Sequence, residues 1–204
     1  DDLHGVGPAS KLLCMFLIAL LLYYLNVRIT LFLPFHFLNF LLTLLWMVAL
    51  SNSFNLLDNM DGLSGGVALG CSFNLLYYAV QMEQYFITFY LLVFIGALCG
   101  FMRFNYWGGR IFMGDSGALF VGFNLAVVTI LESFFIPGKS SASAVLTPLF
   151  IFAVPFYDTL SVIVIRIRNG QPVYKGDLNH LSHRIHRSGF SKRLTVFLIF
   201  VMTL

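Results

Sequence analysis

The feature that most constrains this sequence is a series of long apolar runs separated by short polar segments. Of the 204 residues, 59% are apolar and only 10% are charged, whereas soluble domains carry about a quarter charged residues. So little polar surface cannot cover a water-soluble globule. The composition therefore excludes a single soluble domain, a disordered tail and a nucleic-acid-binding module, and it predicts an integral membrane protein with no nucleic-acid partner.

A membrane-spanning helix needs about 20 mostly apolar residues, and the runs are continuous, not alternating as in a barrel. We therefore predict an all-α fold, a polytopic transmembrane helical bundle with six spans and a truncated seventh. The spans are expected at 11–26, 36–51, 64–80, 84–103, 116–136 and 144–165, and the truncated one from 194. Because the chain opens at Asp1 without a preceding element and ends in an apolar run, we expect one integral-membrane domain over 1–204, incomplete at both ends.

Six spans in series place the connecting segments alternately on two sides of the membrane. One side receives 1–10, 52–63, 104–115 and 166–193, and the other receives 27–35, 81–83 and 137–143. Counted with Lys11 and Arg103 at the span ends, the first side holds ten of the twelve Lys and Arg residues, leaving Arg28 and Lys139 for the second. Positively charged residues gather on the cytoplasmic side of membrane proteins. The first side is therefore predicted to be cytoplasmic, and it also carries most of the polar motifs.

The first of these motifs is a run of oxygen-bearing side chains at a spacing of three, Asn52, Asn55, Asp58 and Asp61. Residues three apart share one face of a helix, and carboxylate and amide oxygens suit Mg²⁺ or the polar groups of a ligand. The alternative is a capping stretch before the span at 64, because Asp and Asn are favoured helix caps. Caps account for one or two such residues, so four favour a binding site.

Two more acidic motifs lie on the same side. Asp115 stands between glycines in the segment Phe112–Gly117, where a carboxylate at the membrane surface is costly to bury unless a cation pairs with it. A helix cap before the span at 116 is the alternative. Asp1 and Asp2 are followed by the cation Lys11, and alone they fit either a site or a solvated terminal pair.

The segment 166–193 combines seven of the twelve Lys and Arg residues with His180, His183 and His186. Arginine forks suit phosphate oxygens, yet such a segment could equally bind anionic lipid headgroups, and charge alone leaves both open. His180 and His183 have no third soft ligand nearby, and the three cysteines lie within apolar runs, so we expect no zinc site.

Carboxylates and amides for a divalent metal, cations for phosphates and an apolar setting together indicate phosphoryl transfer between a nucleotide-linked donor and a lipid. The main rival is a membrane transporter or flippase of a lipid-linked or phosphorylated solute. Against it, the acids gather at one face and no inverted repeat is evident. A CDP-alcohol enzyme is a further rival, but the downstream Gly and Asp spacing that it needs is absent.

At these residues the chain resembles the polyprenyl-phosphate N-acetylhexosamine-1-phosphate transferases, a bacterial family that also contains the muramoyl-pentapeptide translocases. Five motifs carry the resemblance, in order and across essentially the whole chain. They are Asp1-Asp2, the N-x-x-N-x-x-D-x-x-D-G-L segment Asn52–Leu63, Phe104-Asn105 with Phe112–Gly117, the P-x-x-D-T segment Pro155–Thr159, and His180–Arg184.

The resemblance implies transfer of a sugar 1-phosphate from a UDP-N-acetylhexosamine to polyprenyl (undecaprenyl) phosphate, releasing UMP, as the first membrane step of cell-envelope polysaccharide synthesis. It further implies Mg²⁺ as cofactor, with Mn²⁺ as an alternative. The expected setting is the bilayer of the bacterial inner (plasma) membrane, with the active site on the cytoplasmic face. A homodimer is also expected from the resemblance.

Residue roles follow from the same resemblance. Asp115 and Asn55 would ligate the metal, and Asp1, Asp2 and Asp115 would be catalytic, with one of the first two deprotonating or orienting the lipid phosphate. The implied substrate-binding residues are Lys11, Asn52, Asp58, Asp61, Asn105, Phe112, His180, His183 and Arg184. Among these, Asn105, Asp61 and Phe112 would meet the uridine, and the histidines, Arg184 and Lys11 the phosphates or sugar.

The chain departs from the family pattern in three places. Gly108-Gly109 replaces a frequent Pro-Ala, Ala118 replaces a Ser, and His180-Leu-Ser-His183-Arg184 replaces the His-rich form of the muramoyl-pentapeptide branch. These differences favour the branch that uses UDP-N-acetylglucosamine or a related hexosamine for surface polysaccharide or teichoic acid. The sugar, the polymer and the choice between direct attack and a covalent intermediate stay open.

One acid lies inside a predicted span. Asp158 is near the inner end of 144–165 and close in sequence to Arg166. An acid inside the membrane is a candidate functional residue, but we favour an ion pair that holds the helix against the basic segment.

Overall fold

The computed structural model describes residues 7–29, 35–107, 109–134, 144, 146–172 and 179–204. These residues form nine helices, and no strand is found among them, so the all-α prediction is confirmed. The helices are α1 (Pro8–Tyr24), α2 (His36–Leu57), α3 (Leu63–Gln81), α4 (Tyr85–Asn105), α5 (Gly114–Leu131), α6 (Thr147–Ile151), α7 (Ala153–Arg168), α8 (Leu181–Arg187) and α9 (Lys192–Met202).

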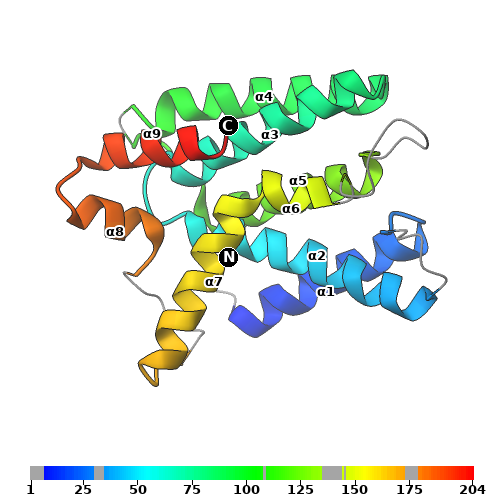
Figure 1. Ribbon diagram of the computed structural model, residues 1–204, viewed down its shortest axis with the longest axis horizontal. Coiled ribbons are helices and arrows are strands. Elements are labelled where there is room, and N and C mark those ends of the chain that lie inside the picture. Colours follow the sequence, from blue (N-terminus) through cyan, green and yellow to red (C-terminus); the bar gives the residue numbers. More distant parts are fainter. Residues whose placement is uncertain (1–6, 30–34, 108, 135–143, 145, 173–178) are drawn as a thin grey trace.

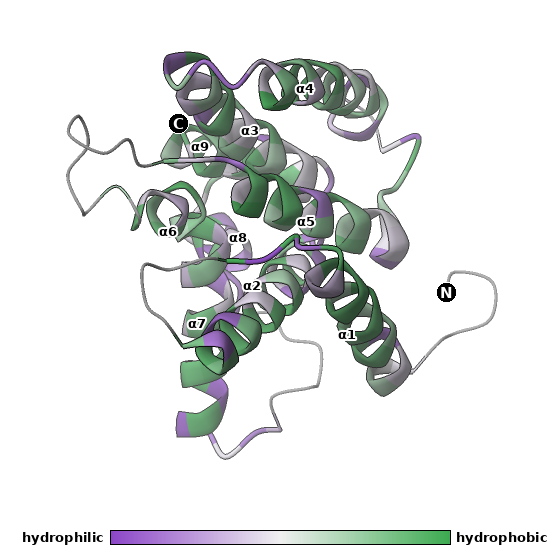
Figure 2. Cartoon of the chain, turned by 90° about the vertical axis from the view of Figure 1, so that its right-hand side faces the viewer, coloured by the Kyte–Doolittle hydropathy of each residue, from purple (hydrophilic) through white to green (hydrophobic). Residues whose placement is uncertain are grey.

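Four of the helices, α2 to α5, are long and apolar enough to cross a membrane, and α1 adds a shorter apolar helix. They run roughly side by side along the horizontal of Figure 1. Hydrophobic residues also cover the outward faces of α1 and α4, as Figure 2 shows. On α4 the exposed side chains include Phe86, Phe89 and Val93. Large apolar side chains turned outward suit lipid and not water, so the chain is a multi-pass membrane protein.

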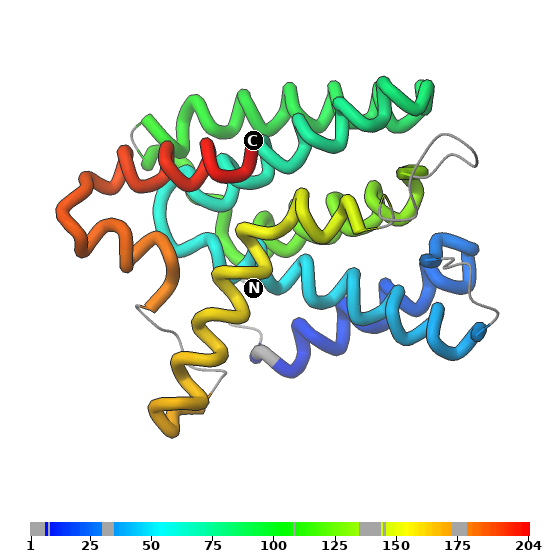
Figure 3. The backbone as a smooth tube through the Cα atoms, in the orientation of Figure 1, coloured from blue at the N-terminus to red at the C-terminus, as the bar shows by residue number. Residues whose placement is uncertain are grey.

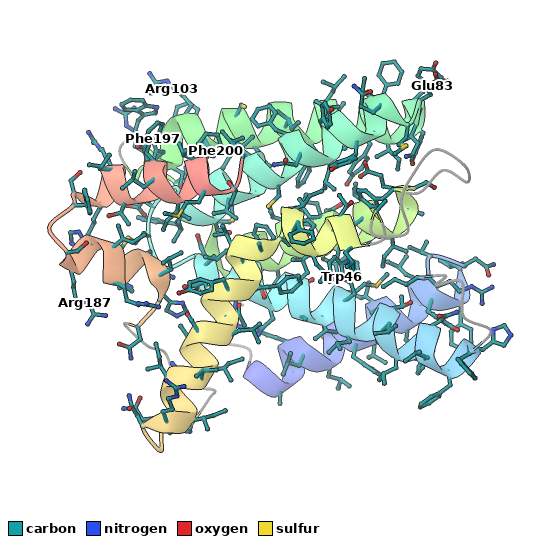
Figure 4. The ribbon with its side chains drawn as sticks, viewed as in Figure 1. Trp46, Glu83, Arg103, Arg187, Phe197 and Phe200 are labelled. Atoms are coloured by element: carbon teal, nitrogen blue, oxygen red, sulfur yellow. The ribbon has the colours of Figure 1, made fainter. Side chains whose placement is uncertain are left out.

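Helix α2 is the centre of the bundle, packing against α5 most extensively and also against α1, α7 and α3. Trp46 of α2 lies between these elements (Figure 4) and donates from Nε1 to Thr129 Oγ1 of α5 at 2.9 Å. Its ring also meets Phe152 and Phe156 with centroid distances of 6.1 and 5.5 Å. This aromatic cluster fixes α5 and α7 to the same central helix.

Helix α5 lies tightly against the backbone of α2 at Gly122. A Cβ there would lie 2.7 Å from Cα of Ser51 and 3.1 Å from the carbonyl oxygen of Leu50. Both are backbone atoms, which cannot move aside as a flexible side chain can. Only a residue without a Cβ therefore lets these two helices pack at this distance.

We expect Gly122→Ala to lower the free energy of unfolding by roughly 1–3 kcal/mol, because the added methyl group overpacks the α2–α5 contact. The matched control is Gly100→Ala on α4, where a Cβ would meet nothing within 4 Å. That change should leave stability unchanged or raise it slightly, since Ala favours helix over Gly. Thermal unfolding of the full-length protein in detergent measures both, and equal midpoints for the two variants would contradict the prediction.

Two helix boundaries differ from the sequence prediction. Helix α2 continues six residues beyond the expected end at Ser51, to Leu57. The polar residues that suggested an end are accommodated within the helix, since Ser51 Oγ donates to the Met47 carbonyl and Ser53 Oγ to the Ala49 carbonyl, at 2.6 and 2.8 Å. Hydroxyls bonded to the carbonyl four residues back need no water, so the helix extends into the polar segment.

The expected span 144–165 is divided into α6 and α7, which meet at Phe152. Pro155 explains the division. It has no N–H to donate to the carbonyl of Ile151, the last residue of α6, and its ring would clash with that carbonyl in a continuous helix. Helix α7 then runs steeply across the direction of α2 to α5 (Figure 1).

The ends of the helices that carry polar motifs gather at one end of the bundle, on the left of Figure 3. Ion-pair and hydrogen-bond contacts join the beginnings of α1, α3, α5, α8 and α9 with the ends of α2 and α4. In Figure 4, Arg103 and Arg187 lie at this end and Glu83 at the other. Within the described residues, these contacts agree with the predicted grouping of 52–63 and 104–115 with parts of the terminal and basic segments at one end.

Candidate active site

The centre of this polar end is the short connection between α2 and α3. Asp58 is the C-cap of α2, and α3 begins after Gly62, whose φ of 80° is left-handed. A Cβ on Gly62 would also lie 2.6 Å from the Tyr106 ring. The prediction that the four polar residues 52, 55, 58 and 61 share one helical face is therefore correct for Asn52 and Asn55, which lie on the last turns of α2. It is wrong beyond them, because the helix ends before Asp61.

Two other carboxylates, those of Asp61 and Asp115, act on Asp58. The pKa of Asp58 is raised to about 6, first by burial and then by the negative charges of Asp115 and Asp61. A backbone hydrogen bond from Gly114, the first residue of α5, opposes the rise. The three carboxylates thus form one negative region, the acid cluster (Asp58, Asp61 and Asp115), in which a cation would be stabilised.

Lys11 supplies one such cation. Its Nζ forms an ion pair with Oδ2 of Asp115, which joins the first turn of α1 to the first turn of α5. The side chain of Asp115 is still 47% exposed and that of Lys11 is 20% exposed. The carboxylate is therefore held in place on one side and open on the other. Its position in the first turn also favours a negative charge.

Asn105, the last residue of α4, is buried and joins the two loops that border the acid cluster. Its Oδ1 accepts from the backbone N–H of Gly62 at 2.6 Å, and its Nδ2 donates to the carbonyl of Ile111 at 2.7 Å. The resemblance predicts a contact between Asn105 and uridine. That contact stays a prediction. The structure gives Asn105 two backbone partners, which join the loop 58–62 to the loop residues 109–113.

The loop residues 109–113, which precede α5, lie against Asp61 of the acid cluster. Asp61 Oδ2 lies 3.0 Å from the point where a Cβ on Gly109 would be, so the carboxylate packs directly against this loop. Phe112 is 73% exposed and Trp107 is 61% exposed. A free aromatic face beside a carboxylate suits a planar base that also offers hydrogen-bond donors.

The basic segment contributes α8, with His180 as its N-cap. His180 is buried and its Nδ1 lies 2.7 Å from Oδ2 of Asp158, whereas Arg184 is exposed. The rings of His180 and His183 meet edge to face, 6.5 Å apart. The pKa of His183 is lowered, first by burial and then by His180 and the cations around it.

A hydrogen bond connects this basic helix to the acid cluster. Ser182 Oγ donates to Oδ1 of Asn59 at 2.6 Å, which places α8 directly against the loop between Asp58 and Asp61. Tyr106 makes a similar connection, since its hydroxyl donates to the carbonyl of Arg193 at the start of α9, at 3.0 Å. Asn59, Ser182 and Tyr106 were missed in the sequence, where no spacing or charge distinguishes them.

The donor set fits a hard divalent cation with few protein ligands. Asn55 Oδ1 is buried and has no hydrogen-bond partner, which leaves an amide oxygen in need of one. Within the described part of the chain, no three His, Cys, Asp or Glu side chains are close enough to hold an ion by themselves. Mg²⁺ suits such a site, because it keeps several waters and takes only one or two carboxylates together with substrate phosphates.

The capping alternatives are wrong for both acidic motifs. Helix α3 has Gly62 and helix α5 has Met113 as N-cap, so neither Asp61 nor Asp115 is the N-cap residue of the helix that follows it. Asp1 and Asp2 lie outside the described residues. The ion pair expected for Asp158 with the basic segment takes the form of its contact with His180.

Comparison with known sequences decides the family. Residues 1–133, which include the acid cluster and Asn105, match the family model described as glycosyl transferase family 4. The chain belongs to this family. The match ends just after α5, so it includes the connection between α2 and α3 but not the basic helix α8.

Three curated relatives extend the family comparison. The chain is 33% identical over 162 residues to a Bacillus subtilis protein named "probable undecaprenyl-phosphate N-acetylglucosaminyl 1-phosphate transferase". It is 33% identical over 177 residues to a Mycobacterium leprae decaprenyl-phosphate N-acetylglucosaminephosphotransferase. An Escherichia coli K12 undecaprenyl-phosphate alpha-N-acetylglucosaminyl 1-phosphate transferase is 31% identical over 169 residues. The matches cover 78–79% of this chain and 44% of each relative, so the chain spans under half of their length.

Proposed function

We propose that the full-length protein transfers N-acetylglucosamine 1-phosphate from UDP-N-acetylglucosamine to undecaprenyl phosphate or a related polyprenyl phosphate. An oxygen of the lipid phosphate forms a bond to the phosphorus that carries the sugar, the bond from that phosphorus to the UMP oxygen breaks, and UMP leaves. The observation that carries the proposal is the acid cluster, where burial and then the charges of Asp115 and Asp61 raise the pKa of Asp58, at the end of the bundle that also holds α8. The names of the family relatives support the lipid and the sugar.

Asp115 and Asn55 would hold Mg²⁺, or Mn²⁺ in its place, with Asp58 and Asp61 lending negative charge. Such an ion neutralises the charge of a diphosphate. Lys11 holds the carboxylate of Asp115 in position through its ion pair. The unpartnered Oδ1 of Asn55 supports the metal assignment.

The remaining residues would orient the two substrates. Phe112 stacks on the uracil base, and Asp61 accepts a hydrogen bond from the uridine. Asn52 lies one helical turn before Asn55 and adds polar lining. His183 and Arg184 on α8 meet the phosphates or the sugar, with His180 beside them. Asp1 and Asp2 orient or deprotonate the lipid phosphate.

We also infer six membrane crossings, with α1 and the α6–α7 pair added to the four long helices. Residues 1–204 form one membrane domain of a longer protein, a homodimer in the bacterial inner membrane. The concentration of Lys and Arg at the polar end supports a cytoplasmic active site. An active site at that face meets soluble UDP-sugar from the cytoplasm and the lipid phosphate from the bilayer.

The test uses the full-length protein in membranes, with UDP-N-acetylglucosamine, undecaprenyl phosphate and Mg²⁺. We expect UMP and a lipid-linked N-acetylglucosamine diphosphate in equal amounts, and neither when the lipid phosphate is omitted. UDP-glucose and UDP-muramoyl-pentapeptide should give far less UMP. Passage of solute across sealed vesicles without UMP release would instead support the transporter alternative.

A further inference from the structure

Asp158 in the middle of α7 is a buried acid that the proposed chemistry does not use. Its side chain has no exposed surface, and each of its oxygens has a different partner. Oδ2 lies 2.7 Å from Nδ1 of His180, and Oδ1 accepts from the backbone N–H of Leu181 at 2.6 Å. A single carboxylate thus binds both the N-cap side chain and the first backbone N–H of α8.

This arrangement fixes the orientation of the His180 ring. A carboxylate at Nδ1 accepts the proton on that nitrogen, so Nε2 is the nitrogen left for other partners. A charge without partners in such a buried position would carry a large free-energy cost. The two hydrogen bonds offset that cost only while α8 remains in its observed position. The position of α8 is therefore coupled to the charge of Asp158.

A second hydrogen bond holds α8 against the loop that carries Asp58 and Asp61. Ser182 is buried and donates to Asn59, which lies between Asp58 and Asp61 in the sequence. With Asp158 holding the start of α8 and Asn59 holding its second residue, His183 and Arg184 have little freedom to move away from the acid cluster.

We propose that Asp158 is a positioning residue for the transfer reaction, which acts through His180 to hold the cations of α8 where the diphosphate of the donor binds. The proposal rests on the proposed function. It differs from a role in stability alone, because a residue that positions a binding group changes the apparent affinity for the donor. Loss of folded protein lowers the amount of active enzyme and leaves the KM unchanged.

The experiment measures UMP release by the full-length protein in detergent, with the donor concentration varied at saturating lipid phosphate. In Asp158→Asn the amide has only one oxygen, so it cannot accept from both His180 and Leu181. We therefore expect the KM for UDP-N-acetylglucosamine to rise at least about tenfold, the size of effect found for residues that orient a metal-binding side chain. The kcat per folded enzyme should change less than about threefold, because this interaction is equally strong before and during transfer. The matched control is Thr159→Val, which removes a neighbouring hydroxyl oxygen that has no partner, and it should leave both values unchanged.

A double variant tests whether Asp158 acts through His180. If Asp158 acts through His180, the KM of Asp158→Asn combined with His180→Gln should be no higher than that of the worse single variant, because coupled residues are not additive. Ser182→Ala removes the second hydrogen bond and should also raise the KM, by about threefold, which gives a second measurement if Asp158→Asn fails to fold.

The outcomes separate the two proposals. An unchanged KM in Asp158→Asn, or in Ser182→Ala where the first variant does not fold, would overturn the positioning role while wild-type activity keeps the proposed function. Additive effects in the double variant would overturn the route through His180. No UMP from the wild-type protein with any UDP-sugar would instead remove the proposed function itself.

Discussion

Asp115→Asn is expected to reduce sugar 1-phosphate transfer by about 10²–10³-fold or more, the loss typical when a group that stabilises charge in the transition state is removed. The variant keeps the shape of the side chain but loses its charge. Two interactions depend on that charge, the ion pair with Lys11 and the electrostatic interaction with Asp58. The remaining open side of Asp115 is where the metal is proposed to bind.

The loss should be specific to this carboxylate. Glu83→Gln is the matched control, since it makes the same chemical change at an exposed acid on the other end of the bundle (Figure 4), and it should leave the rate unchanged. UMP release measures activity, and thermal unfolding in detergent shows whether each variant is folded. A folded Asp115→Asn enzyme with the normal rate would remove Asp115 from the catalytic residues.

Metal binding gives a readout that does not require turnover. Addition of Mg²⁺ to metal-free protein should raise the unfolding temperature of the wild type, because a ligand that binds only the folded state stabilises it. The rise should be lost in Asp115→Asn and kept in Glu83→Gln. An equal rise in all three proteins would place the ion elsewhere.

Much of the architecture could be predicted from the sequence because a bilayer imposes simple rules. Apolar runs of the right length become helices, and charge places their ends, so the polar ends of α2, α4 and α5 were correctly expected to meet. The boundaries were less predictable. Ser51 looks like an end in the sequence, but its hydroxyl bonds within the helix, and Pro155 looks like part of a span but divides it.

The candidate site was also predictable only in part from the sequence. Motif spacing drew attention to Asp58, Asp61 and Asp115, and in the structure the charges of Asp115 and Asp61 act on Asp58. The roles of the three acids in a site stay a prediction. The contacts that assemble the site join residues far apart in the chain, such as Lys11 with Asp115 and Asn59 with Ser182. Such pairs depend on how the helices pack, and no local pattern in one sequence encodes them.

Asn105→Ala is expected to damage both stability and activity, because Asn105 joins two loops and is not simply a substrate contact. The change leaves the buried N–H of Gly62 and the carbonyl of Ile111 without their partner. A buried polar group left without a hydrogen bond costs about 1–3 kcal/mol. Of the two groups only the N–H of Gly62 is in a buried residue, since Ile111 is exposed, so the free energy of unfolding should fall by roughly 1–3 kcal/mol. With the loop 58–62 and the loop residues 109–113 no longer held together, transfer should fall about 100-fold, as expected for a small misplacement of catalytic groups.

Asn124→Ala provides the matched control for this prediction. Asn124 on α5 also makes two side-chain hydrogen bonds, one from the Tyr90 hydroxyl and one to the Phe120 carbonyl, but it is only half-buried and joins no two loops. Its loss should cost under about 1 kcal/mol, the net value of an ordinary hydrogen bond, and leave transfer unchanged. A residue that only contacts uridine would raise the KM for the donor without changing the unfolding temperature. If Asn105→Ala shows that pattern, the bonds to Gly62 and Ile111 do not position the loops, and the contact with uridine implied by the family resemblance is the better account of Asn105.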